Sequence, residues 1–449
     1  MTTEDTDPDA DPDPDADPDA DPDPVLYPNA RGAGASRPDV SRRRLLASGA
    51  VAGAAATAGC VGGGDRGDGD GDGDGDEEAD RPTVFVFNTG DGTVSLIDPE
   101  RDELVGTRAV GLSSSFPSNQ YTPELADGPD ESLWLNVGRG VRGLSVGSLS
   151  ETASVETGSG ANWLERTPDG AHVVVSAREP RHGQFRVDAD PASGTFGEVT
   201  GEIDRAAEGG TGGQGGPGPC DVTIHPDGEH AYVPDIFGDT LTVLAVDPFG
   251  IATQVDVERV GDGPARPWMA TASPDGRTLL VEHDEGDAGA ESLWDVTDPA
   301  APRERARLTA DDGLGRRPLT SEIGPDSETG YVFTPGSNDV TVVDLPSGTV
   351  SDRLDLGGSA FVGTWNPSRT KLYVPVQTND EVAVIDHARG EITERIDVGP
   401  SPYGATAALA RPRADGTSTA AVAMARLGLS IGAVETTYCI GNCACGHRL

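Results

Sequence analysis

An all-β fold is predicted by three features of this 449-residue sequence. First, 61 glycines and 35 prolines interrupt the chain too often for long helices, and only 35% of the residues are apolar. Second, from about residue 81 onward, short β-rich runs alternate with Pro-Asp-Gly, Asn-Asp and Gly-Asp turns, which is the pattern of hairpins. Third, similar runs recur along the chain. A helical fold is therefore excluded for this part of the sequence.

The charge of the chain is strongly acidic. Its 76 acidic residues against 33 basic ones give a net charge of −43, and Lys371 is the single lysine. Such a chain repels nucleic acid, so we expect no nucleic-acid partner. In strong salt the Debye length falls to about 3 Å, which screens self-repulsion. We interpret the charge as adaptation to an extremely saline habitat, not as a binding site.

Residues 1–40 form an acidic segment that we expect to be disordered. Residues 1–24 repeat Asp-Pro-Asp-Ala and offer almost nothing apolar to bury. Export signals sit at the start of a chain, and a signal-like segment begins at Ser41. The alternative is therefore that translation starts at Val40 and this segment is never made.

Residues 41–60 resemble a twin-arginine export signal followed by a lipoprotein cleavage box. Arg42 and Arg43 precede a run of small and apolar residues that ends at Cys60. The run is shorter than the about 20 apolar residues of a membrane-spanning helix. The resemblance implies export and lipidation of Cys60, with plain signal cleavage nearby as the alternative, since Thr57 stands where Leu is common. The Gly/Asp-rich residues 61–81 would then be a flexible tether that holds the protein at the outer face of the cytoplasmic membrane.

Residues 82–434 carry an internal repeat. Three segments have the same form, namely a strand that begins near a Tyr-Val pair, a turn and a second strand. They lie at residues 232–243, 331–344 and 373–386, and residues 84–98 share the form. Six turn prolines spaced 39 to 58 residues apart mark the units: Pro129, Pro168, Pro226, Pro274, Pro325 and Pro367.

Units of this length predict a β-propeller. A four-stranded sheet of about 40 to 50 residues cannot bury both its faces alone, and radial stacking of such sheets covers them. Residues 402–409 are expected to form a seventh inner strand, which completes the incomplete first blade. We therefore predict seven blades closed between the two ends of the chain. Residues 419–424 have the pattern of a further strand, so an eight-bladed propeller is the alternative.

The repeat resembles a known family. The Tyr-Val strand, the Asn-Asp turn and the strand Val382-Ala383-Val384-Ile385-Asp386 look like the YVTN-type repeats of surface-layer proteins and YncE-like secreted propellers. The resemblance covers roughly residues 81–433. It implies a propeller architecture and does not select one function, because propellers include binding modules and several unrelated enzymes.

The inner strands are expected to present a polar face to a central channel. Side chains alternate between the two faces of a strand, so positions counted back from each turn proline fall into a channel set and a packing set. The channel set combines threonines with four carboxylates, which suit a hard cation such as calcium. These candidate ion ligands are Glu124, Glu165, Asp221 and Glu322. A hydrated acidic funnel without an ion is the alternative. The packing set includes Cys220, which we expect to be a buried small residue.

Residues 435–449 form a Cys/His-rich tail. Cys439, Cys443 and His447 have the C-x3-C-x3-H spacing, and Cys445 lies between them. Thiolates and an imidazole at this density suit copper or zinc. The spacing is similar to that of the binuclear copper loop of cytochrome oxidase and nitrous oxide reductase, although the chain ends before that loop's Met. The alternative is two disulfides, formed after export by these three cysteines and Cys220.

These features predict an exported, lipid-anchored propeller at the cell surface that acts as a binding or interaction module, with a protein or cell-surface partner. An enzyme is the less favoured expectation, and no catalytic residue is assigned. Two alternatives remain open. The tail would make the protein a redox or copper-handling one, whereas the carboxylates Glu165, Asp221 and Glu322 resemble, in part, the metal ligands of lactonase-like propeller hydrolases.

Overall fold

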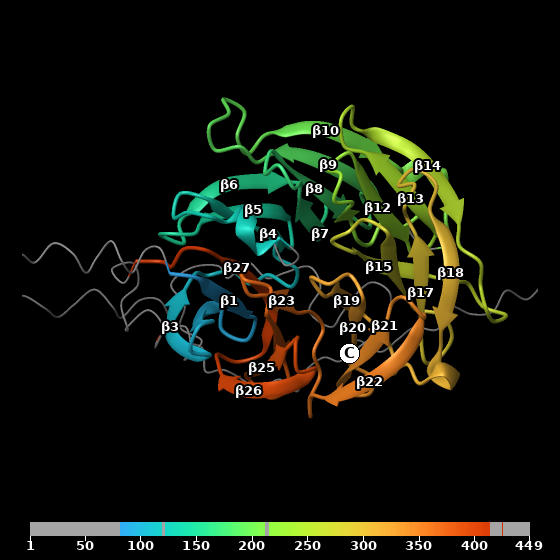
Figure 1. The fold of residues 1–449 in the computed structure, drawn as a ribbon. Coiled ribbons are helices and arrows are strands. Elements are labelled where there is room, and N and C mark those ends of the chain that lie inside the picture. Colours follow the sequence, from blue (N-terminus) through green and yellow to red (C-terminus); the bar gives the residue numbers. More distant parts are fainter. Residues whose placement is uncertain (1–80, 119–121, 212–214, 414–423, 425–449) are drawn as a thin grey trace, which may run out of the picture. The chain divides into compact units, whose positions relative to one another are not determined.

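A computed structural model describes residues 81–118, 122–211 and 215–413, together with Met424. These residues belong to one compact unit, which spans Gly69–Leu449. They form six four-stranded sheets and one three-stranded sheet, all with antiparallel neighbours. The prediction of an all-β, seven-bladed propeller is confirmed, and Figure 1 shows the blades following one another around the centre.

The blades are numbered here in chain order, and their strands are as follows. Blade 1 contains β27 (Pro402–Ala408), β1 (Thr83–Asn88), β2 (Thr93–Asp98) and β3 (Glu103–Ala109); blade 2 contains β4 (Ser132–Val137), β5 (Gly140–Ser145) and β6 (Glu151–Glu156); blade 3 contains β7 (Ala161–Arg166), β8 (His172–Ala177), β9 (Gly183–Asp188) and β10 (Val199–Asp204); blade 4 contains β11 (Thr223–Ile224), β12 (His230–Asp235), β13 (Thr240–Ala245) and β14 (Gly250–Asp256).

The remaining blades have the same order from the centre outward. Blade 5 contains β15 (Pro267–Ala272), β16 (Thr278–His283), β17 (Ala290–Asp295) and β18 (Arg303–Leu308); blade 6 contains β19 (Thr320–Ile323), β20 (Thr329–Thr334), β21 (Asp339–Asp344) and β22 (Thr349–Asp355); blade 7 contains β23 (Thr364–Trp365), β24 (Lys371–Val376), β25 (Glu381–Asp386) and β26 (Glu391–Asp397). Among the described residues, no helix is long and apolar enough to cross a membrane.

The two ends of the described chain close the ring. β27 pairs with β1 in antiparallel register, with Thr406 opposite Phe85, as expected for a seventh inner strand that completes the first blade. This arrangement lets the first and last strands share one sheet, so β1 is paired on both sides. Residues 419–423, which suggested an eighth blade, lie outside the described residues.

Blade 2 differs from the expected pattern. An inner strand was predicted just before Pro129, but the structure has a 3-10 helix η1 (Pro123–Leu125) there, and the sheet has three strands. The preceding segment takes over the central position, because Ser118 donates its backbone N–H to Trp134 O at 2.8 Å and Phe116 is fully buried. Pro129 therefore correctly indicated a blade at this place, but the prediction of an inner strand before it was wrong.

An apolar cluster, called here the axial cluster, joins the inner strands of the blades. Phe116 packs on Trp163 with ring centroids 4.3 Å apart and on Tyr403 at 5.8 Å, and Tyr403 stacks on Phe361 at 4.8 Å. Cys220 belongs to the same cluster and is fully buried, which confirms its expected burial. Trp163, two residues before Glu165 on β7, belongs to this cluster as well, so apolar and carboxylate side chains share the inner strand.

Candidate functional site

Three of the four predicted channel carboxylates are buried deep in the propeller. Glu165, Asp221 and Glu322 lie on or next to the inner strands of blades 3, 4 and 6, and each is at most 5% exposed. Burial raises the pKa of Glu165 to about 8, and it raises the pKa values of Asp221 and Glu322 well above the usual range. These groups are thus held in a region that disfavours their charge.

Two of these carboxylates link adjacent blades. Asp221 accepts the backbone N–H of Ala270, in blade 5, at 2.7 Å, while Glu165 accepts that of Ile224, in blade 4, at 2.8 Å. Two threonines of the inner strands also form hydrogen bonds to the next blade. The Thr271 hydroxyl donates to the carbonyl of Ser321 at 2.9 Å, and the Thr320 hydroxyl donates to that of Phe361 at 2.7 Å. The polar face of the inner strands therefore joins blade to blade, which satisfies backbone groups at the buried centre.

The fourth predicted carboxylate does not join them. Glu124 lies on η1, its side chain is 47% exposed, and it forms an ion pair with Arg369. Its predicted place in the ring depended on an inner strand that blade 2 lacks. The assignment of Glu124 to the channel was therefore wrong. Within the described ranges, no group of three or more His, Cys, Asp and Glu side chains is placed to hold a metal ion. The structure does not assemble the four carboxylates into one calcium site.

Two further buried carboxylates were missed. Glu282 on β16 and Glu291 on β17 are direct cross-strand partners, and both are fully buried. All four of their carboxyl oxygens lack a hydrogen-bond partner among the described residues. Burial raises the pKa of Glu282 to about 8 and that of Glu291 well above its usual range, and each charge disfavours the other. The sequence carried a partial signal, because Glu282 directly follows the apolar run Leu279-Leu280-Val281.

A pocket of about 280 Å³, called here the β16–β17 pocket, opens beside this pair, at the turn that joins β16 to β17. Blade 5 contributes Trp268 and the turn, and the loop before β19 contributes Arg316 and Arg317. The backbone N–H of Arg317 donates to Ala288 O at 2.6 Å, which ties this loop to the turn. The lining residues are Trp268, His283, Asp284, Gly286, Asp287, Gly289, Arg316 and Arg317.

The titratable groups of this pocket have different environments. His283 is buried, and this burial together with Arg307 lowers its pKa well below the usual value, so the imidazole is neutral. Its Nδ1 lies 3.1 Å from Ala265 O, which only accepts, so Nδ1 carries the proton and Nε2 accepts from the Ser292 hydroxyl at 2.7 Å. Asp284 is held by Arg266 at 3.1 Å.

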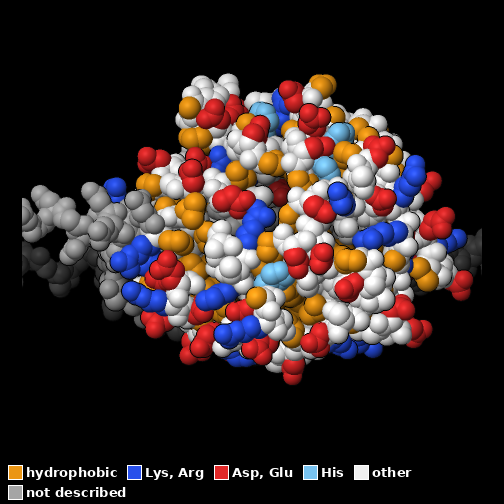
Figure 2. Space-filling view, viewed as in Figure 1, with side chains coloured by type: hydrophobic (Ala, Val, Ile, Leu, Met, Phe, Trp, Pro, Cys, Tyr) orange, Lys and Arg blue, Asp and Glu red, His pale blue; other side chains and the backbone are white. Residues whose placement is uncertain are grey.

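The two arginines of the loop are the distinctive feature of the pocket. Arg316 is exposed and Arg317 half-buried, and neither forms an ion pair with a described carboxylate. Figure 2 shows acidic side chains spread over the visible face with arginines between them. In a chain of charge −43, two neighbouring guanidinium groups free of such pairs provide five donors each for an anionic ligand.

Several predicted site residues lie outside the described residues. They are Arg42, Arg43 and Cys60 of the signal and Cys439, Cys443, Cys445 and His447 of the tail. The predictions made for them remain predictions.

Comparison with known proteins supports the fold. No family model matches the chain, and no curated relative does. Three solved structures are similar to this chain, and each match covers 73% of this chain and 99% of the matched chain. They include the periplasmic gluconolactonase of Pseudomonas aeruginosa, at 16% identity and TM-score 0.56. A provisionally assigned 6-phosphogluconolactonase of Bacteroides uniformis matches at 16% identity and a TM-score of 0.58. A protein of Lactobacillus plantarum matches at 13% identity and a TM-score of 0.59. The chain is a seven-bladed β-propeller whose structural neighbours include lactonase-like propellers.

Proposed function

We propose that the protein is a binding propeller that takes a small organic anion in the β16–β17 pocket. The observation that carries the proposal is the pair Arg316 and Arg317 at a pocket wall, without a described carboxylate partner. Guanidinium groups bind carboxylates and phosphates through two parallel hydrogen bonds. In a strongly acidic protein, most arginines form ion pairs with nearby carboxylates, so two arginines without such a pair are available to a ligand.

The size and the wall of the pocket suggest a sugar acid. A volume of about 280 Å³ suits a ligand of the size of a six-carbon acid. Trp268 offers an apolar face for the ring or chain, while Asp284 and Asp287 can accept hydrogen bonds from hydroxyl groups. Because two structural neighbours are named for gluconolactone chemistry, gluconate and 6-phosphogluconate are the natural probes.

Calorimetric titration of the full chain with gluconate, 6-phosphogluconate and inorganic phosphate tests this proposal. We expect binding of at least one organic acid, and a loss of tenfold or more, roughly 1.4 kcal/mol, in the double variant R316A/R317A. The matched control is R259A/R303A, which removes two exposed arginines from outer strands and a neighbouring loop. Unchanged affinity in R316A/R317A, or an equal loss in the control, would overturn the proposal.

A lactone hydrolase is the second candidate, supported by Asp284. This carboxylate lines the pocket and is oriented by Arg266, so it is placed to activate a water molecule as a general base. The buried Glu165, Asp221 and Glu322 are not accessible for this role. Hydrolysis of glucono-δ-lactone followed by pH-stat would be expected to fall about a hundredfold in D284N, while gluconate binding persists. A rate equal to the uncatalysed one would reject this candidate.

For the location of the protein, we propose export by the twin-arginine route and lipid anchoring through Cys60. The proposal is supported by the sequence from Arg42 to Cys60. Fractionation of cells expressing the full chain is expected to find it in the membrane fraction, facing outward. C60A should release it to the medium, whereas R42K/R43K should retain it in the cytoplasm. Equal distribution of all three proteins would contradict the proposal.

For the tail, we propose that Cys439, Cys443, Cys445 and His447 bind one copper or zinc ion, supported by their spacing. Metal analysis with thiol titration, on protein purified without chelators, is expected to give about one equivalent that disappears in C439S/C443S. Absence of metal together with absence of free thiols would favour the disulfide alternative instead.

A further inference from the structure

A tyrosine closes some blade interfaces of the propeller. In blades 6 and 7 it stands at the third position of the second strand and reaches the turn that follows the third strand of the next blade. The Tyr331 hydroxyl lies 2.8 Å from Nδ1 of His387, and the Tyr373 hydroxyl donates to Asp102 Oδ1 and lies 3.3 Å from Pro99 O. Tyr331 also packs against Trp365, with ring centroids 5.9 Å apart. The phenol thus fills the space between the two blades.

Blade 5 lacks this tyrosine and has Leu280 at the same position of β16. Here Arg305, from the outer strand β18, reaches across the interface instead. Its guanidinium donates to Leu345 O at 3.0 Å and to the Thr278 hydroxyl at 3.2 Å. Leu345 follows β21 as Pro99 follows β2, so the guanidinium binds a carbonyl that corresponds to the one near the Tyr373 hydroxyl. Leu280 itself is fully buried and packs with Val332 and Val343 of blade 6, so the apolar part of this interface is closed and the opening lies beside Arg305.

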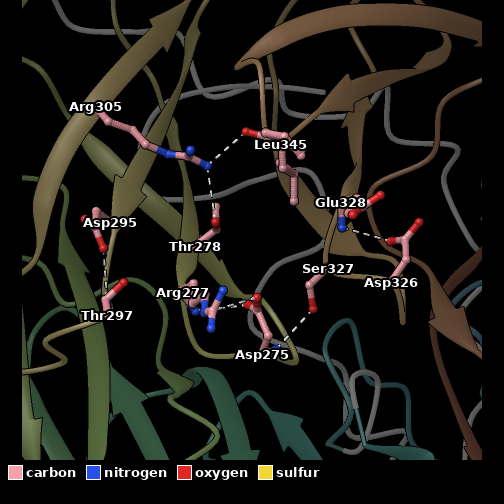
Figure 3. Close-up of a pocket in the computed structure, with 11 residues that line it drawn as sticks. Asp275, Arg277, Thr278, Asp295, Thr297, Arg305, Asp326, Ser327, Glu328 and Leu345 are labelled. Carbon is pink, nitrogen blue, oxygen red and sulfur yellow. Dashed lines mark hydrogen bonds and ion pairs between the residues drawn. The ribbon is translucent and has the colours of Figure 1, made fainter.

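A pocket of about 380 Å³, called here the side pocket, lies at this interface between blades 5 and 6. Figure 3 shows Arg305 and Thr278 on one side and Asp326, Ser327 and Glu328 on the other, with Asp275 and Arg277 at one end. Its walls combine carboxylates, guanidinium groups and hydroxyls, and none of the described residues that line it is aromatic. Such walls do not suit an apolar or aromatic ligand.

The polar groups are held in place by their own turns. Asp275 accepts from the Ser273 hydroxyl at 2.7 Å, and its backbone N–H donates to the Ser327 hydroxyl of blade 6 at 3.1 Å. Oδ1 of Asp295 accepts the backbone N–H of Thr297 at 3.0 Å. Hydrogen bonds that use one carboxylate oxygen orient the other oxygen as an acceptor, so the walls are partly preorganised.

We infer that the side pocket binds a neutral saccharide. Groups of both signs line it, so an ion of either sign meets repulsion, whereas a sugar hydroxyl is both donor and acceptor and can satisfy carboxylates and guanidiniums alike. The net charge of −43 also does not repel a neutral ligand, as it would an anion. This site is distinct from the β16–β17 pocket, which contributes none of its lining residues.

Saturation-transfer NMR and calorimetry with glucose, trehalose, glucosamine and gluconate test this inference on the full chain. We expect the neutral sugars to bind, with affinity unchanged between about 0.2 and 2 M NaCl because no charge is neutralised. The variant D295N/E328Q keeps the shape of the side chains and should weaken binding about fivefold, by loss of charged acceptors. The control D344N/E229Q changes the corresponding positions of blades 6 and 4 and should have no effect.

The outcomes separate this site from the proposed function. Neutral sugars should still bind to R316A/R317A, whose changes lie in the other pocket. Absence of neutral-sugar binding, binding of the charged probes alone, or an equal loss in D344N/E229Q would each overturn the inference. Loss of gluconate binding in R316A/R317A with retained sugar binding would support both sites independently.

Discussion

The interfaces on the two sides of blade 6 are built from the same repeat and have different properties. Between blades 6 and 7, Tyr331, Trp365 and His387 pack together and leave a closed contact. Between blades 5 and 6, Leu280 stands at the position of the tyrosine and is buried, Arg305 makes the polar contact, and two pockets lie along the interface, as does a pair of carboxyls without a described hydrogen-bond partner. The comparison teaches that two interfaces with closed apolar parts can differ in the polar group, a phenol or a guanidinium, that spans them.

The largest expected effect is on the closed interface. Y331A removes a buried ring and should lower the free energy of unfolding by about 3 to 5 kcal/mol, as for other large-to-small core changes. Y331F removes only the hydroxyl bond to His387 and should cost about 1 kcal/mol. Chemical denaturation in high salt measures both. Equal losses in the two variants would show that the hydroxyl, not the ring, closes the interface.

The open interface should respond to pH through Glu282 and Glu291. Burial raises both pKa values above those of the unfolded chain, so the folded state binds more protons between about pH 4.5 and pH 8. Stability should therefore fall as pH rises through this window, by about 1.4 kcal/mol per pH unit for each proton involved. Melting curves should show a flatter pH dependence in E282Q/E291Q. An unchanged slope in this variant would assign the effect to Glu165, Asp221 or Glu322.

Conversion of one interface into the other is a sharper test with a smaller effect on stability. L280Y/R305M places a phenol where blades 6 and 7 have one and removes the guanidinium that holds Leu345 O. We expect saccharide binding to be lost, with a stability loss of about 1 to 3 kcal/mol, because the phenol is larger than the buried Leu280 side chain. Denaturation and calorimetry on the same sample check both parts. Retained sugar binding would mean that the missing tyrosine does not create the side pocket.

The smallest effect is expected at Glu124. Its ion pair with Arg369 is partly exposed, so E124Q should change the free energy of unfolding by less than about 1 kcal/mol. The buried counterpart E165Q should change the pH dependence of stability, because burial raises the pKa of Glu165 to about 8. Thermal melts with and without calcium compare the two. A large calcium-dependent effect of E124Q would contradict its placement outside the channel.

The repeat made much of the fold predictable from the sequence. The Tyr-Val strands, the turn prolines and residues 402–409 predicted seven blades and closure of blade 1 by β27, as found. Local signals were sufficient because each repeat must stack on its neighbours to bury its faces. The missing inner strand of blade 2 was not predictable, since Phe116 fills the centre from a segment without a strand pattern.

The candidate site was less predictable. Glu165 and Asp221 lie on or next to inner strands, but their links to neighbouring blades depend on contacts between residues 59 and 49 positions apart. Arg316 and Arg317 have no pattern of their own; only the approach of their loop to the β16–β17 turn makes them pocket residues.

By itself, the sequence determined the all-β class, the number of blades, the place where the ring closes and the burial of Cys220, because these follow from alternation, turn chemistry and repetition along the chain. The tertiary structure alone decided which carboxylates are buried together, which interface lacks its tyrosine plug, and where two arginines stand without a described acidic partner. The physical reason is that pKa shifts, pockets and unpaired charges arise from groups that only packing brings together, whereas a repeat is written into neighbouring residues.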